Sequence, residues 1–184
     1  MLRNSAIRAE GIWKGYKQGG HFYWTLQGLD VEIMEGESIA VLGGPGAGKT
    51  TLLKVLGFRE KPEKGQVYFQ DRMLSWNCEK AIGQMQKERV WLLDTCNEKG
   101  RLEIENRERL RAVLLDEPEL LFNLKGQCTL YGQLHSLNIQ GVAVIMATCK
   151  PEVASWSRVI YKLKNGKLEK LTGKIRGEMW KTGK

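Results

Sequence analysis

Residues 38–56 read SIAVLGGPGAGKTTLLKVL, and this stretch decides the fold. Its first five residues form a short apolar run typical of a buried parallel strand, and residues 50–56 predict a helix. The glycine-rich segment between them satisfies G-x-x-x-x-G-K-[ST], with its fixed positions at Gly43, Gly48, Lys49 and Thr50. Strand, loop and helix in this order predict a phosphate-binding loop in an α/β fold.

Each residue type in this loop has a chemical reason. Glycines let the backbone curl so that successive N–H groups point at phosphate oxygens, and the start of the following helix adds partial positive charge. Lys49 would reach the β- and γ-phosphates, and the Thr50 hydroxyl would ligate Mg²⁺. A chance glycine turn is disfavoured because a buried strand precedes it. We therefore expect Mg²⁺ and ATP to bind at Gly43, Gly44, Pro45, Gly46, Ala47, Gly48, Lys49, Thr50 and Thr51.

Two carboxylates end a second apolar run. Val113-Leu114-Leu115-Asp116-Glu117-Pro118 places Asp116 and Glu117 at the carboxyl end of a predicted buried strand, the edge at which open α/β sheets bind ligands. Asp116 would hold the Mg²⁺ shell, and Glu117 would act in catalysis by orienting the attacking water. Taken alone, the segment could be a strand-end turn before a helix, since Pro favours that position. The upstream phosphate loop favours the catalytic interpretation.

The remaining pattern indicates an α/β chain. Alternation and short apolar runs predict strands, and the Asn165-Gly166 pair predicts a closing hairpin. The polar segment 71–111 is weakly periodic. We expect a P-loop NTPase core with a mostly parallel sheet, helices on both faces, antiparallel strands at the N-terminus and a C-terminal hairpin. The expected strands are 29–33, 38–42, 66–70, 89–93, 112–115, 142–147, 158–163 and 167–171, and the expected helices are 50–56, 78–87, 102–110, 127–137 and 151–155.

Composition sets further bounds. Hydrophobic residues make up 42% and charged residues 27% of the 184 residues, which excludes gross disorder. No apolar run is long enough to cross a bilayer, so we expect no transmembrane segment and a place in the cytoplasm or at the inner face of the membrane. None of the four cysteines forms a CxxC pair, which argues against a structural metal. The net charge of +8 lies largely late in the chain but lacks interleaved aromatics, so no nucleic-acid partner is expected.

Together these motifs resemble the ATPase domain of ABC transporters. The resemblance rests on residues 26–43, on the acidic strand end, and on segments that resemble the strand before the family's switch histidine (142–148) and its closing hairpin (158–168). It covers residues 6–70 and 110–170, and the N-terminal half is most similar to the lipoprotein-releasing and macrolide-export subgroup. The resemblance implies a single nucleotide-binding domain over 1–172, with a reduced helical region at 71–111, and a basic tail at 173–184.

Upstream, Trp13-Lys14-Gly15-Tyr16 resembles the family's adenine-stacking aromatic loop. Tyr16 fits the stacking position best, Trp13 comes second, and stacking on an adenine face suits either ring. An aromatic at the core or at a sheet edge explains the same residues equally well. Both interpretations stay open at this point.

The chain also departs from the family. The interval between Phe69 and Ala112 is much shorter than in the family, and it holds no LSGGQ signature. Gln84 and Gln86 are the candidates for a remnant of the glutamine loop. Cys149 stands where the family has its switch histidine, and Asn123 stands where the family has an aspartate.

The resemblance implies a membrane permease and a second ATPase subunit, in a homo- or heterodimer, as partners. The departures predict hydrolysis that is weak or partner-dependent. The alternative is a degenerate module that binds ATP without hydrolysing it and has a structural or regulatory role. A third hypothesis, another P-loop NTPase such as a small kinase, is disfavoured by the closing hairpin and by the Gly-Glu turn at residues 36–37.

Overall fold

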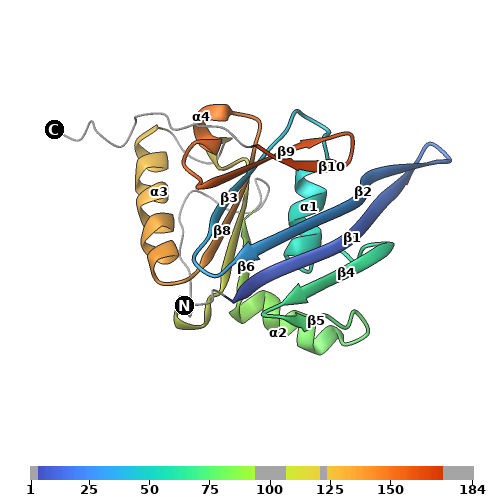
Figure 1. Cartoon of the computed structure of the whole chain (residues 1–184), viewed down its shortest axis with the longest axis horizontal. Helices are drawn as coiled ribbons and strands as arrows, with labels where there is room; N and C mark the ends of the chain where they lie inside the picture. Colours follow the sequence, from blue (N-terminus) through green and yellow to red (C-terminus); the bar gives the residue numbers. More distant parts are fainter. Residues whose placement is uncertain (1–3, 94–106, 121–123, 172–184) are drawn as a thin grey trace.

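The computed structural model describes residues 4–93, 107–120 and 124–171. Within these ranges the strands form two sheets, one with the order β2-β1-β4-β5 and one with the order β10-β9-β3-β8-β7-β6. The two sheets lie on either side of a helix, α1 (Lys49–Leu56), while α3 (Leu124–Ile139) and α4 (Pro151–Ala154) cover the far face of the larger sheet (Figure 1). This arrangement confirms the predicted fold class.

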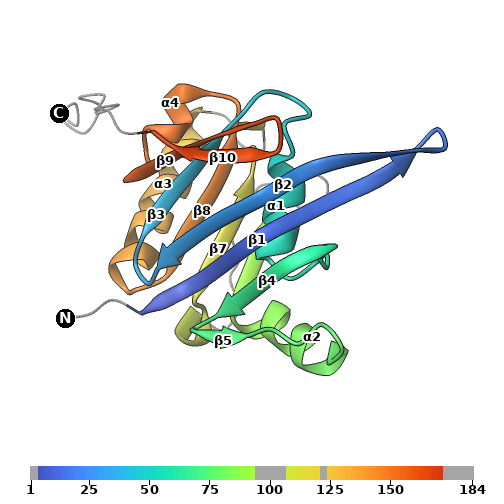
Figure 2. The ribbon, with the colours of Figure 1, turned by 45° about the vertical axis from the view of Figure 1, so that its right-hand side comes forward.

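The smaller sheet is antiparallel and begins with a long hairpin. Strands β1 (Ser5–Gln18) and β2 (His21–Met34) pair along their length, and β4 (Lys64–Phe69) and β5 (Arg72–Met73) extend the sheet beyond β1. The tip of this hairpin projects past the rest of the molecule (Figure 2). The sequence predicts a strand in this region only over 29–33, whereas β2 begins at His21.

The larger sheet carries the parallel strands. Its members are β3 (Ser38–Leu42), β6 (Val90–Leu93), β7 (Ala112–Asp116), β8 (Ala143–Thr148), β9 (Val159–Lys164) and β10 (Lys167–Lys170). Strands β6, β7, β8, β3 and β9 run parallel, and β10 turns back on β9 through the expected hairpin. Leu42 pairs with Thr148 and Asp116 pairs with Ala147, so the carboxyl ends of β3, β8 and β7 meet at one edge.

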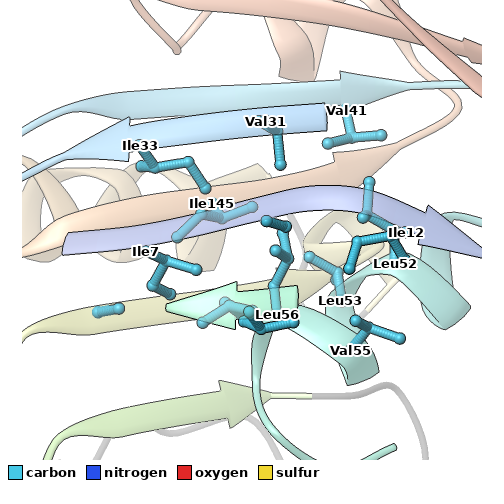
Figure 3. Packing of buried hydrophobic residues seen from close by; sticks show 14 of the residues in the cluster. Ile7, Ile12, Val31, Ile33, Val41, Leu52, Leu53, Val55, Leu56 and Ile145 are labelled. Atoms are coloured by element: carbon cyan, nitrogen blue, oxygen red, sulfur yellow. The ribbon is translucent and has the colours of Figure 1, made fainter. Parts of the chain in front are cut away.

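Helix α1 fills the space between the sheets. Its apolar side chains Leu52, Leu53 and Leu56 are at most 1% exposed. They pack with Ile7 and Ile12 of β1 and with residues of β2, β3 and β8 (Figure 3). Six of its eight residues are buried, so the helix has to be covered on more than one side, and the second sheet provides that cover. The position of α1 therefore fixes the position of the phosphate loop that precedes it.

Alternate residues of the central strands face two different cores. Leu114 belongs to the cluster around α1. Val113 and Leu115 belong to a second cluster with Leu130 and Leu134 of α3. Coverage on both faces explains why these strands read as continuous apolar runs rather than as alternating ones.

The shortened interval holds α2 (Glu79–Glu88), which confirms the helix expected at 78–87. The helix expected at 102–110 is not found over residues 107–110, where the chain forms a single 3₁₀ turn at Arg107–Arg109. Residues 102–106, Asn123 and the expected basic tail at 173–184 lie outside the described residues. No helix within 4–93, 107–120 and 124–171 combines the length and the apolar character needed to span a membrane.

Candidate functional site

The predicted phosphate loop sits where three parallel strands end. Gly43 follows β3, and its backbone N–H donates to the carbonyl of Thr148 at the end of β8, over 3.1 Å. The loop then leads into α1, whose first residue is Lys49. The loop is thereby held between the sheet edge and the start of the helix, so its N–H groups and the helix end face the same space.

Gly48 is required by both conformation and packing. Its φ of 99° is in the left-handed region that favours glycine. A Cβ atom built there would lie 2.9 Å from Cγ2 and 3.2 Å from the carbonyl oxygen of Thr25, on the β1–β2 hairpin. The loop therefore packs directly against the smaller sheet, and this contact leaves no room for a side chain.

Lys49 is held between the loop and the acidic strand end. Its side chain is 5% exposed, and its Nζ donates to the carbonyl of Gly44 over 3.1 Å. The same Nζ lies 3.3 Å from Oε1 of Glu117. A buried ammonium placed over a loop of backbone amides is suited to an anionic ligand, because phosphate oxygens can replace the carboxylate as its partner.

Thr50 and Asp116 meet although 66 residues separate them in the chain. The Thr50 hydroxyl donates to Oδ2 of Asp116 over 2.5 Å, and Asp116 is 6% exposed. A hydroxyl and a carboxylate are the hard oxygen ligands that Mg²⁺ prefers. Among the described residues no group of three or more His, Cys, Asp or Glu side chains could hold a metal.

Glu117 adopts a left-handed backbone conformation with a φ of 45°. Its N–H donates to the carbonyl of Ala147 over 2.8 Å, and its carbonyl accepts from Leu120 over 2.9 Å. Non-glycine residues rarely adopt this conformation, and such strain concentrates at functional sites. The turn carries the Glu117 carboxylate back toward Lys49, in front of the phosphate loop.

Tyr16 lies over the first turn of α1. Its hydroxyl lies 3.3 Å from Oγ1 of Thr51 and donates to Oε2 of Glu60 over 2.5 Å. Tyr16 is 39% exposed, and the ammonium of Lys14 lies 5.5 Å from its ring centroid. Burial and the bond to Glu60 raise the pKa of Tyr16 to about 12, and the hydroxyl therefore keeps its proton near neutral pH.

The second aromatic candidate has a different environment. The Trp13 ring packs edge-on against Trp24 with 5.2 Å between ring centroids, and its indole lies over Gly28. The ammonium of Lys64 lies 5.8 Å from the Trp13 ring centroid. Trp13 is thus part of an aromatic cluster on the hairpin, whereas Tyr16 is the candidate that touches α1.

A buried hydrogen bond between Thr148 and Glu119, next to the loop, was not predicted from the sequence. The Thr148 hydroxyl donates to Oε1 of Glu119 over 2.5 Å and accepts from the N–H of Lys150 over 3.0 Å. Thr148 is fully buried and Glu119 is 7% exposed. The exposed Cys149 lies in the chain between Thr148 and Lys150, so this bond spans it. A polar residue ending an apolar strand was the only signal in the sequence.

Both glutamine candidates, Gln84 and Gln86, lie on α2, and the contact of Gln86 places it away from the loop. Gln86 on α2 donates from Nε2 to the carbonyl of Phe58 over 2.5 Å, just beyond the carboxyl end of α1. The phosphate loop is at the opposite end of that eight-residue helix, about 12 Å away at 1.5 Å per residue. This geometry does not support Gln86 as part of the phosphate site.

A glycine-rich segment between a strand and a helix, enclosed by a parallel and an antiparallel sheet with an acidic strand end beside it, is typical of nucleotide-binding α/β proteins. The family model described as "ABC transporter" matches residues 26–143 of this chain, which is more than half of its length. The chain therefore belongs to the ABC transporter family.

Similarity to individual proteins is partial in sequence. Over 74 residues the chain is 40% identical to the lipoprotein-releasing system ATP-binding protein LolD of Xylella fastidiosa strain Temecula1. Over 68 residues it is 44% identical to the LolD protein of Bdellovibrio bacteriovorus. These matches cover 40% and 37% of this chain and 31% of each relative, so the chain spans about a third of the curated relatives it matches.

Solved structures share the fold. A bacterial ABC transporter cassette, MJ0796, solved as a dimer, has a TM-score of 0.75 at 20% identity, covering 91% of this chain and 99% of that one. CbiO1 from Clostridium perfringens has a TM-score of 0.72 at 16% identity, covering 97% and 92%. At these identities the likeness establishes the fold alone.

Proposed function

We propose that this chain is an ATP-binding subunit of the ABC transporter type that binds Mg–ATP at the loop Gly43–Thr50. The observation that carries the proposal is the meeting of two distant segments: Thr50 bonds to Asp116, and Lys49 pairs with Glu117. A glycine-rich turn with no ligand to bind has no need for a buried ammonium and an acidic strand end in front of it. The residues of the loop and of the strand end also match the chemistry that a nucleoside triphosphate requires.

Each residue has a defined part in this proposal. The loop amides and Lys49 hold the β- and γ-phosphates, and Thr50 and Asp116 hold Mg²⁺. The metal, when bound, neutralises charge on the phosphate oxygens. The Tyr16 ring stacks on the adenine. Once a phosphate has replaced Glu117 as the partner of Lys49, the Glu117 carboxylate orients the attacking water.

Turnover is expected to be weak or dependent on a partner subunit. Cys149 stands where the family has an imidazole, and a neutral thiol is a weak hydrogen-bond donor. Losing one electrostatic contact to the reacting group commonly costs about 3 kcal/mol in the transition state. Binding suffers less, because it draws on the loop, on Lys49 and on Mg²⁺.

The proposed partner subunits are inferred from the family to which the chain belongs. ABC-type subunits pair with a second ATPase subunit and with a membrane permease, and we propose the same partners here, at the inner face of the membrane. The similarity to two lipoprotein-releasing ATP-binding proteins favours that subgroup. The shortened interval between β5 and β7 leaves less surface for docking on a permease, which supports the alternative of a non-hydrolysing regulatory module.

ATP binding and phosphate release, measured side by side on the full chain, test the proposal. Wild type should bind Mg–ATP, and Lys49→Ala should lose that binding without loss of folding. If wild type releases phosphate faster than Lys49→Ala does, the non-hydrolysing alternative is wrong. If Glu117→Gln then leaves that release unchanged, Glu117 is not the catalytic residue, because a general base contributes roughly 100-fold or more.

A further inference from the structure

Tyr16 is held by a carboxylate that lies outside both nucleotide motifs. Glu60 follows α1 by four residues and is 44 residues from Tyr16 in the chain. Its Oε2 accepts from the Tyr16 hydroxyl over 2.5 Å, and its Oε1 lies 3.2 Å from Nζ of Lys54 on α1. One carboxylate thus joins the aromatic ring on β1 to the helix that follows the phosphate loop.

The segment that carries Glu60 is itself fastened to β1. Nζ of Lys14 donates to the carbonyl of Lys61 over 2.8 Å and to Oε1 of Glu63 over 3.1 Å. The backbone N–H of Gly15 donates to Oε2 of Glu63 over 3.1 Å. The Lys14 side chain is 13% exposed and the Glu63 side chain is 35% exposed. Glu60 is therefore presented to Tyr16 from a fixed position rather than from a free loop.

The protonation states of the pair keep this bond in place. Burial and the bond to Glu60 raise the pKa of Tyr16 to about 12. Burial alone would raise the pKa of Glu60, but the bonds from Tyr16 and Lys54 and the charges of Lys54 and Lys14 bring it below the ordinary value. Near neutral pH the phenol remains a donor and the carboxylate remains a charged acceptor, which is the stronger kind of hydrogen bond.

A fixed ring matters for binding a flat base. A partly exposed tyrosine samples several rotamers, and a ligand that stacks on it must first order the ring. Anchoring at the hydroxyl removes that cost in advance. The ammonium of Lys14 lies over the ring, 5.5 Å from its centroid, so a base would stack on the other face. The anchor also sets the ring beside Thr51, next to the predicted Mg²⁺ ligand Thr50.

We infer that Glu60 is a positioning residue for base recognition, which holds the Tyr16 ring ready to stack on the purine of a nucleoside triphosphate bound at the phosphate loop. This inference rests on the proposed function, because it needs a triphosphate at Gly43–Thr50. It adds a residue that contacts no ligand but improves the affinity for the base. Glu60 should therefore affect ligands that carry a base and leave base-free ligands unaffected.

Calorimetric titration of the full chain with Mg–ATP, and separately with inorganic triphosphate and Mg²⁺, tests the inference. Glu60→Ala removes the acceptor, and Tyr16→Phe keeps the ring but removes the donor. Glu60→Gln retains an acceptor oxygen and should restore most of the loss. Glu32→Ala is the matched control, because it removes an exposed carboxylate from the neighbouring strand β2 with the same change in charge.

We expect Glu60→Ala and Tyr16→Phe each to weaken Mg–ATP binding roughly fivefold, the effect of one hydrogen bond, with triphosphate binding unchanged. The double variant should lose no more than either single variant. Equal losses for both ligands, no loss at all, or the same selective loss in Glu32→Ala would overturn the inference. A wild type that binds triphosphate and ATP equally well overturns it while leaving the phosphate site intact. A wild type that binds neither ligand overturns the proposed function as well.

Discussion

Lys49 and Glu117 form an ion pair across the phosphate loop, with 3.3 Å between Nζ and Oε1. Lys49, which we propose binds the phosphates, is therefore paired with Glu117, which we propose orients the attacking water. The Lys49 side chain is 5% exposed and the Glu117 side chain is 28% exposed, so Glu117 is the partner that solvent reaches more readily. An incoming triphosphate has to replace the Glu117 carboxylate as the partner of Lys49. The displaced carboxylate stays close to the phosphates, and the two negative charges repel each other.

Glu117→Gln should bind Mg–ATP more tightly than wild type. The substitution removes the charge that competes for Lys49 and repels the phosphates. We expect a gain of about 1 kcal/mol, or roughly fivefold in Kd, since the pair is partly screened by solvent. Calorimetry at fixed ionic strength measures the change, with Lys49→Ala as the variant that loses binding. Unchanged or weaker binding by Glu117→Gln would show that the ion pair does not compete with the ligand.

Gly48→Ala should destabilise the fold more than Gly46→Ala. Both glycines have positive φ, 99° for Gly48 and 73° for Gly46, so both variants carry backbone strain of about 1 kcal/mol or more. At Gly48 the new Cβ also meets Thr25 at 2.9 Å, whereas at Gly46 no other residue lies within 4 Å. We expect a total cost of roughly 2–4 kcal/mol for Gly48→Ala, because its Cβ contact adds to the strain.

Urea unfolding gives both free energies, provided that the two variants keep the same dependence on denaturant. Gly46→Ala is the matched control, since it shares the loop and the sign of φ but lacks the contact. Equal costs for the two variants would mean that the loop does not press against Thr25.

The parallel sheet, and the position of the glycine-rich loop beside the acidic strand end, could be predicted because their signals are local. The apolar runs of β3, β7 and β8 are short and bounded, and parallel strands bring their carboxyl ends to one edge. The meeting of Thr50 with Asp116 follows from those two facts. The left-handed backbone at Glu117 does not follow from them, because it depends on a turn between Asp116 and η2 (Pro118–Leu120), which begins with Pro118.

The hairpin could not be predicted in its full length. Register shifts interrupt the β1–β2 pairing at several points, for example between Ala9 and Ile12, and they break the alternation that identifies a strand. The first half of β2 is also largely exposed on both faces, from His21 to Trp24, so burial gives no period there. The contact between Tyr16 and Glu60 depends on this hairpin reaching α1, and no spacing in the sequence indicates it.

Leu53→Ala should be among the most destabilising changes in α1. Leu53 is 1% exposed and packs in the core between the two sheets. Large-to-small changes at such sites cost about 2–5 kcal/mol, since a cavity adds to the lost burial. Lys54→Ala is the matched control on the same helix. It removes only a partly exposed pair with Glu60 and should cost about 1 kcal/mol or less. Similar unfolding midpoints for the two variants would contradict the enclosed position of α1.

Glu60 should stabilise the folded chain above its unfolded pKa and lose that effect in acid. The pKa of Glu60 in the folded state lies below the ordinary 4.5, because bonds from Tyr16 and Lys54 and the charges of Lys54 and Lys14 outweigh the effect of burial. The unfolded chain therefore binds a proton at a higher pH than the folded chain does. Stability from this group is fully present above about pH 4.5 and falls as the pH drops through the folded-state pKa.

Unfolding in urea from pH 6 down to pH 3 measures this loss in wild type and in Glu60→Gln. The difference in unfolding free energy between the two should be largest at pH 6 and should shrink below pH 4.5, because Gln has no proton to gain. Added salt should also reduce the difference at pH 6, since the charges of Lys54 and Lys14 act through partly solvated contacts. A difference that stays constant from pH 6 to pH 3 would mean that the folded protein does not favour the charged form of Glu60, and the charged acceptor inferred for Tyr16 would be lost with it.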